Sequence, residues 1–178
     1  PATYTTTSAP KTSTAKTSTT AVRTTAPTTY VPNTEGRYVQ KGNPPWNLRL
    51  VNPWNPLTKE FFDTVPLEKY ASGKEFDQRA MQALKDFIQA GKAYGVYAVS
   101  LYRSYELQTK LYNNEVQKQL KKAGNQAKAE ELAATVVARP GTSEHHTGLA
   151  ADILGSGYSD LVQSFGTSPA GKWLRENC

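Results

Sequence analysis

Both histidines of this chain lie in one short segment, residues 141–154, which reads GTSEHHTGLAADIL. His145 and His146 are adjacent, and Asp152 follows seven residues after His145. Imidazole nitrogens and carboxylate oxygens are donors that hold zinc in proteins, and an imidazole beside a carboxylate also suits acid–base chemistry. Reactive side chains are therefore concentrated in this segment.

The end of the segment, residues 149–154, predicts a strand that carries Asp152 among apolar neighbours. A buried carboxylate without a partner is costly, so Asp152 requires a cation or strong hydrogen-bond donors. Gly148 permits a turn that would bring His145 over Asp152. Three interpretations remain open: a zinc ion held by both side chains, a buried hydrogen-bonded pair, or an imidazole oriented as a general base. His146 should point away, as a supporting or surface residue.

The elements that must position this segment follow from apolar periodicity and from capping residues. Ser104 is a predicted helix N-cap, and Ser168-Pro169 has the pattern that begins a final helix. A capping box over residues 72–75 predicts an earlier helix with an apolar stripe. The expected elements are a short strand at 47–51, a helix from 72–75 to about 90, a strand at 96–102, helices at 105–123 and 126–138, a strand at 149–154 and a helix after 168.

The composition divides the chain into two parts. Residues 1–33 are rich in threonine, serine and proline and have no buried period, so we expect a disordered extracellular linker. Residues 34–178 form the predicted domain. Deleting residues 1–33 should leave the melting temperature of the domain unchanged, and a loss of several degrees in a thermal scan would show that the linker packs on it.

Charge and cysteine content restrict the class of protein. The net charge is +6 and the pI about 9.3, which favours anionic partners such as a cell wall. Basic residues are not clustered with aromatics, so we expect no nucleic-acid binding. The single cysteine, Cys178, excludes a disulfide within the chain. We expect a monomer, and a signal peptide or membrane anchor could precede Pro1.

Four segments resemble one family. SEHHTGLAAD resembles the Ser-x-His-x-x-Gly-x-Ala-x-Asp pattern of VanY-type D-alanyl-D-alanine carboxypeptidases, zinc peptidases of bacterial cell walls with the LAS/hedgehog-like fold. SLYRSYELQTKLY is similar to the family's Tyr-Arg-Ser segment, NLRLVNPWNPL to its entry segment, and WLRENC to its Trp-Leu-x-Glu-Asn helix. The resemblance extends over residues 46–178 and keeps the family order.

The resemblance implies a fold and a site. The fold would be α+β, with helices packed on a small antiparallel sheet and a zinc groove over it. His145 and Asp152 would bind one zinc ion. Arg103 would act in catalysis and bind the substrate carboxylate or the developing oxyanion, with Gln108 and Ser143 as further substrate-binding residues. The substrate would be a peptidoglycan stem peptide ending in D-Ala-D-Ala, at an extracellular or cell-envelope location in bacteria.

One part of the family pattern is absent from these residues. The family's third zinc ligand and its general base belong to a Glu-x-x-His motif after the Trp-Leu-x-Glu-Asn helix, and this chain has no third histidine. We therefore expect both groups beyond Cys178, an incomplete sheet, and an inactive fragment when these residues stand alone. Two alternatives remain: a peptidoglycan endopeptidase of the same fold, and a non-catalytic wall-binding module.

Overall fold

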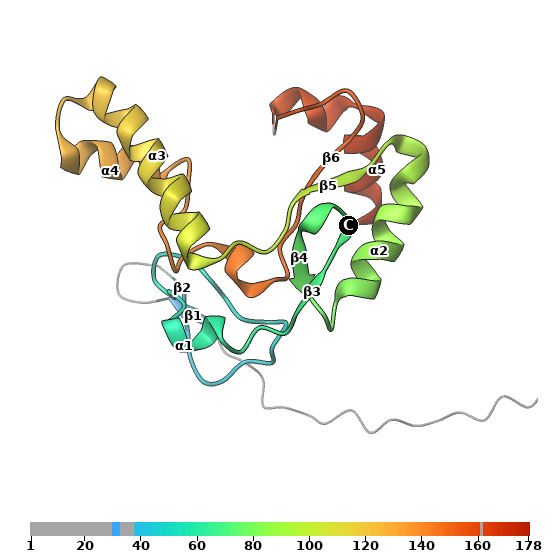
Figure 1. Cartoon of the computed structure of the whole chain (residues 1–178), viewed down its shortest axis with the longest axis horizontal. Coiled ribbons are helices and arrows are strands. Elements are labelled where there is room, and N and C mark those ends of the chain that lie inside the picture. Colours follow the sequence, from blue (N-terminus) through green and yellow to red (C-terminus); the bar gives the residue numbers. More distant parts are fainter. Residues whose placement is uncertain (1–29, 33–37, 161) are drawn as a thin grey trace, which may run out of the picture.

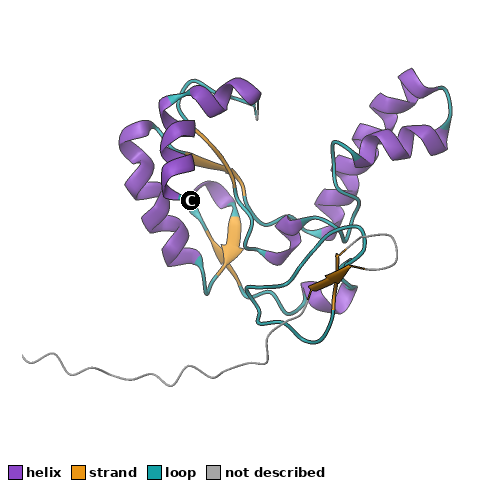
Figure 2. Cartoon of the chain, turned by 180° about the vertical axis from the view of Figure 1, so that it is seen from behind, coloured by secondary structure: helices purple, strands orange, loops and turns teal. Residues whose placement is uncertain are grey.

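The computed structural model describes residues 30–32, 38–160 and 162–178. Helices surround three antiparallel strand pairs, β1–β2, β3–β4 and β5–β6 (Figures 1 and 2). This arrangement confirms the predicted α+β class. No helix in these ranges is both long and apolar enough to cross a bilayer. The elements are β1 (Tyr30–Pro32), β2 (Tyr38–Gln40), α1 (Lys59–Phe62), β3 (Leu67–Lys69), β4 (Glu75–Asp77), α2 (Met81–Ala90), β5 (Tyr97–Ser100), α3 (Tyr105–Ala123), α4 (Gln126–Ala134), β6 (Asp152–Leu154) and α5 (Pro169–Asn177).

The β5–β6 pair joins two segments that are far apart in the sequence. Tyr97 pairs with Leu154, and Ser100 pairs with Asp152, with a register shift between Ala98 and Ser100. The predicted strands at 96–102 and 149–154 are both present in shortened form. The pairing places Asp152 beside the end of β5, and this strand ends three residues before Arg103.

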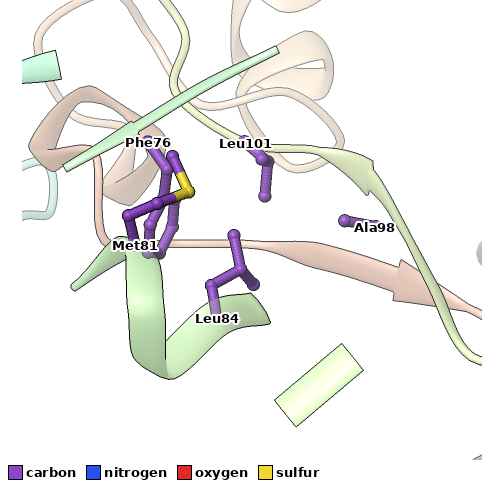
Figure 3. Close-up of a cluster of buried hydrophobic side chains, with 5 residues drawn as sticks. All are labelled: Phe76, Met81, Leu84, Ala98 and Leu101. Carbon is purple, nitrogen blue, oxygen red and sulfur yellow. The ribbon is translucent and has the colours of Figure 1, made fainter. Parts of the chain in front are cut away.

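A buried cluster fixes β5 against α2 and β4. It consists of Phe76, Met81, Leu84, Ala98 and Leu101, and Met81 and Leu101 are each only 1% exposed (Figure 3). Burial of each large apolar side chain contributes roughly 1.5–3 kcal/mol to folding. Leu101 is thus held firmly at the end of β5, and its carbonyl has a fixed direction toward the site described below.

Helices α3 and α4 form an antiparallel arm that projects from the body in both views (Figures 1 and 2). As predicted, the Ser104 hydroxyl caps α3 by accepting a hydrogen bond from the Leu107 backbone N–H at 3.2 Å. Gly124 ends the helix with φ +72°, in the left-handed region that glycine tolerates. The two helices are joined through an apolar cluster of Tyr112, Val116, Ala129 and Ala133.

The predicted helix at 72–75 is wrong at its beginning. Residues 75–77 form β4, which pairs with β3, and α2 begins only at Met81. Strand pairing satisfies the backbone here in place of a capped helix, and the Asp77 N–H also donates a hydrogen bond to the Gly148 carbonyl at 2.8 Å. Phe76 still enters the core, now from a strand.

Two other elements differ from the sequence prediction. Residues 47–51 form no strand, because Asn52 Oδ1 accepts hydrogen bonds from the backbone N–H groups of Trp54 and Asn55 and turns the chain. Helix α4 ends at Ala134 instead of residue 138. Most of the predicted linker, residues 1–33, lies outside the described residues, and Tyr30–Pro32 form β1, which pairs with β2.

Candidate metal and substrate site

His145 lies on a single 3₁₀ turn, Glu144–Thr147, which enters β6 through Gly148. Gly148 has φ +73°, and a Cβ there would meet the Val65 side chain at 3.1 Å and the Asp77 N at 3.2 Å, so only glycine fits without displacement. The His145 ring nitrogen Nδ1 lies 2.6 Å from the Leu101 carbonyl oxygen. A carbonyl only accepts, so Nδ1 carries a hydrogen, and Nε2 is the ring nitrogen left to face the site.

The Nε2 atom of His145 faces Asp152. The distance from His145 Nε2 to Asp152 Oδ2 is 3.3 Å, and the two side chains are 12% and 23% exposed. Arg103 Nη2 also contacts Asp152 Oδ2, at 2.5 Å, and Arg103 Nε donates to Ser100 Oγ at 2.9 Å. The structure therefore brings together three of the predicted site residues, His145, Asp152 and Arg103, from three separate segments of the chain.

Ser100 was missed by the sequence analysis. Its hydroxyl accepts from Arg103 Nε and so fixes the plane of the guanidinium. The available sequence signal was its position in the predicted strand at 96–102, three residues before Arg103; its pairing with Asp152 across β5–β6 is decided by the tertiary structure.

Arg103 and Asp152 line a groove of about 820 Å³ between the β5 end and the α3–α4 arm. The opposite wall is partly apolar, with Leu107 46% exposed and Val136 64% exposed. A cationic and an anionic side chain at the edge of a partly apolar groove are the usual composition of a site for a small polar ligand with apolar parts.

His146 is buried, not at the surface. Its side chain is 0% exposed, its Nδ1 donates to the Arg103 carbonyl oxygen across 2.7 Å, and its Nε2 accepts from the Gly141 N–H at 3.1 Å. Burial lowers the pKa of this imidazole, and the hydrogen bond to Arg103 opposes that shift only in part. Both ring nitrogens are used, so His146 supports the backbone on either side of the site, as the supporting interpretation required, and is no ligand in this arrangement.

Replacing His146 by alanine is expected to destabilise the domain by about 2–4 kcal/mol, because it leaves a cavity and removes the partners of two buried backbone groups. Urea unfolding followed by circular dichroism measures this loss. Glu144→Ala, an exposed change two residues away, is the control and should stay within about 0.5 kcal/mol. A loss below about 1 kcal/mol for His146→Ala would contradict the buried bridging role.

The remaining two predicted substrate-binding residues are buried. Ser143 is 4% exposed and precedes the 3₁₀ turn without capping it through its side chain. Gln108 is 0% exposed, and its Nε2 donates to the Ala138 carbonyl at 2.7 Å. Its Oε1 has no hydrogen-bond partner among the described residues. Neither side chain lines the groove beside Arg103, so their contact with substrate stays a prediction.

The donor types at His145 and Asp152 suit zinc, because an imidazole nitrogen, Nε2, faces a carboxylate beside it. The number of donors is smaller than a catalytic zinc site uses. In the described part of the chain no group of three or more histidine, cysteine, aspartate or glutamate side chains could hold a metal. Cys178, the single cysteine, is exposed. His145 and Asp152 thus offer two donors, whereas a catalytic zinc site usually has three protein ligands.

Comparisons with known proteins agree with this geometry. Residues 73–178 match the family model described as VanY, D-alanyl-D-alanine carboxypeptidase. The chain is 38% identical over 134 residues to a D-alanyl-D-alanine carboxypeptidase of Enterococcus faecalis, covering 74% of this chain and 47% of that protein. It is 41% identical over 146 residues to the putative carboxypeptidase YodJ of Bacillus subtilis, covering 76% and 50%.

Two solved structures are similar throughout most of the chain. A mutant of the vancomycin resistance D,D-pentapeptidase VanY, in complex with Zn(II), aligns with TM-score 0.62 and 35% identity over 75% of this chain and 72% of that one. VanYB in complex with D-alanine-D-alanine aligns with TM-score 0.63 and 35% identity over 75% and 71%. The present chain spans about half the length of the curated relatives that it matches, 47% and 50%.

Proposed function

Since the chain belongs to the VanY family of D-alanyl-D-alanine carboxypeptidases, we propose that the protein is a zinc-dependent D,D-carboxypeptidase that removes the terminal D-Ala from peptidoglycan stem peptides. One observation carries the proposal. His145, with Nδ1 bonded to the Leu101 carbonyl, directs Nε2 at Asp152 from within the family motif. The two family structures with Zn(II) and with D-alanine-D-alanine support the metal and the substrate.

His145 Nε2 and the Asp152 carboxylate would hold the zinc ion. When bound, zinc supplies Lewis-acid chemistry, which polarises a carbonyl and activates water. The chain's own part is to orient the two ligands: the Leu101 carbonyl fixes the tautomer and direction of His145, and strand pairing fixes Asp152. The proposed reaction also requires a third zinc ligand and a general base, and the resemblance implies that both belong to a Glu-x-x-His segment.

Arg103 would bind the terminal carboxylate of the substrate. Its guanidinium has five N–H donors, of which one goes to Ser100 and another to Asp152, and the side chain lines the groove. A forked guanidinium matches a carboxylate geometrically as well as in charge. This assignment places the last residue of the substrate on the α3 side of the zinc ligands.

The test is mass spectrometry of a pentapeptide ending in D-Ala-D-Ala, incubated with the natural protein. Loss of one D-Ala, abolished by a chelator and restored by zinc, is the expected result. Cleavage at an internal bond would support the endopeptidase alternative. Binding to isolated cell walls without any cleavage would support a non-catalytic module. An enzyme with this substrate would act outside the cytoplasmic membrane, at the cell envelope.

Replacing Arg103 by lysine is expected to lower kcat/KM for this pentapeptide about tenfold, and replacement by alanine about a hundredfold, because a charge-assisted forked hydrogen bond is lost. Arg175→Ala, which removes an exposed guanidinium on α5, is the control. Zinc content is measured for each variant, since Arg103 also contacts Asp152. Unchanged kinetics in a zinc-loaded Arg103→Ala variant would rule out the anchoring role.

A further inference from the structure

A second groove is lined by none of His145, Asp152 and Arg103, and nothing in the proposed reaction uses it. Its main chamber, about 320 Å³, is lined by residues that include Asn43, Trp46, Arg49, Thr64 and Arg79. Two of these are arginines, and none of the chamber's lining residues is an aspartate or glutamate. Such a lining favours a negatively charged ligand.

The two arginines are held by aromatic side chains. The Arg49 guanidinium lies 5.0 Å from the centre of the Phe61 ring, and the Arg79 guanidinium 4.0 Å from the centre of the Trp46 ring. Stacking restricts a flexible side chain, so less conformational entropy is lost when a ligand binds. Trp46 remains 42% exposed and offers apolar surface beside the charges.

The two arginines differ in whether an acidic side chain neutralises the charge of the guanidinium. Arg79 forms an ion pair with the buried carboxylate of Asp77, through both Nε and Nη2. Arg49 has no salt bridge to an aspartate or glutamate among the described residues. Arg49 is thus the group in this chamber whose charge is available to a ligand, and Arg79 shapes the wall.

A smaller groove of about 230 Å³ continues the chamber along the segment that carries the proposed metal ligands. It shares Trp46, Arg49 and Thr147 with the chamber and extends to Ala150. Thr147 and Ala150 stand between His145 and Asp152 in the sequence. Glu144 also lines this smaller groove, so an anion is favoured only in the chamber beyond it.

The direction of the substrate follows from the two grooves. Arg103, the proposed anchor of the terminal carboxylate, lines the groove that contains Asp152 and α3 residues. The smaller groove, which extends to Ala150 two residues before Asp152, offers the remainder of the peptide a path away from Arg103. This path leads to Arg49.

We infer that the Trp46–Arg49 chamber is a subsite for an acidic peptide segment, in which Arg49 binds a carboxylate carried by the substrate upstream of the scissile bond. The inference rests on the proposed function for the direction of the chain. It makes Arg49 a specificity-determining residue, and it makes the stem peptide's upstream charge part of what the enzyme recognises.

Calorimetry with the natural protein in its zinc-free form compares the binding of two peptides. Cleavage assays then compare the same two peptides as substrates. They are pentapeptides ending in D-Ala-D-Ala that carry either glutamate or its amide three residues before the terminal D-Ala. The acidic peptide should bind about tenfold more tightly than the amide peptide, and its kcat/KM should be about tenfold higher. This is the order of magnitude for one charge-assisted hydrogen-bonded contact. A tripeptide without the upstream residue serves as the basal substrate.

Arg49→Gln should bring the ratio between the acidic and amide peptides to about one, without changing kcat/KM for the tripeptide. Arg49→Lys keeps the charge and should retain part of the ratio, whereas Arg175→Gln, the control, should retain all of it. A wild-type ratio near one, or a ratio that survives Arg49→Gln, would overturn the inference. Absence of D-Ala release from any peptide would instead refute the proposed function, and the calorimetric ratio would still decide about the subsite.

Discussion

Replacing His145 or Asp152 by alanine is expected to abolish tight zinc binding in the natural protein. Changes to residues that merely orient a metal ligand already cost about 10–100-fold in affinity, so loss of a ligand should cost more than about a hundredfold. The Nε2 atom of His145 faces the Asp152 carboxylate at 3.3 Å, so each side chain presents a donor atom to the same point. Zinc content per protein after dialysis, measured by mass spectrometry, checks the result.

The matched control is the neighbouring imidazole. His146→Ala should retain zinc, because both nitrogens of His146 are bonded to backbone groups of Arg103 and Gly141. Circular dichroism has to show that each variant is folded, since His146→Ala is also expected to be less stable. Zinc content that falls for His146→Ala and not for His145→Ala would overturn the assignment of ligands.

The second large effect concerns the 178 residues on their own. With added zinc, they are expected to release D-Ala from the pentapeptide at least about a hundredfold more slowly than a form extended by the Glu-x-x-His segment, because loss of a general base alone typically costs about 10²–10⁴-fold. The described residues hold no group of three metal-binding side chains, so zinc would also be bound weakly. D-Ala release over time, at equal protein concentration, measures the difference.

A rate within about tenfold of the extended form would show that the missing ligand and base lie within these residues. The third ligand would then have to come from Cys178 or from an acidic side chain that moves toward His145. Zinc titration of the two forms separates a weak metal site from a chemical defect, since only a weak metal site responds to excess zinc.

Several features of this protein could be predicted from the sequence, because they depend on neighbours in the chain. The Ser104 and Ser168 caps act on backbone N–H groups three residues ahead, so α3 and α5 begin where the capping pattern placed them. The motif around His145 and Asp152 is similarly compact, so its residues and their order were enough to show the family resemblance, which implied the zinc ligands.

Only the tertiary structure decided how these residues are held. The tautomer of His145 depends on the Leu101 carbonyl, 44 positions away in the sequence, and the plane of Arg103 depends on Ser100 and Asp152 meeting across β5–β6. Residues 72–77 belong to the β3–β4 hairpin and do not begin an α-helix, because their backbone groups form hydrogen bonds to β3 and to Gly148. Local helix propensity contains no information about these partners. Burial of His146 and the stacked arginines beside Trp46 likewise depend on packing between distant segments, for which no local sequence pattern exists.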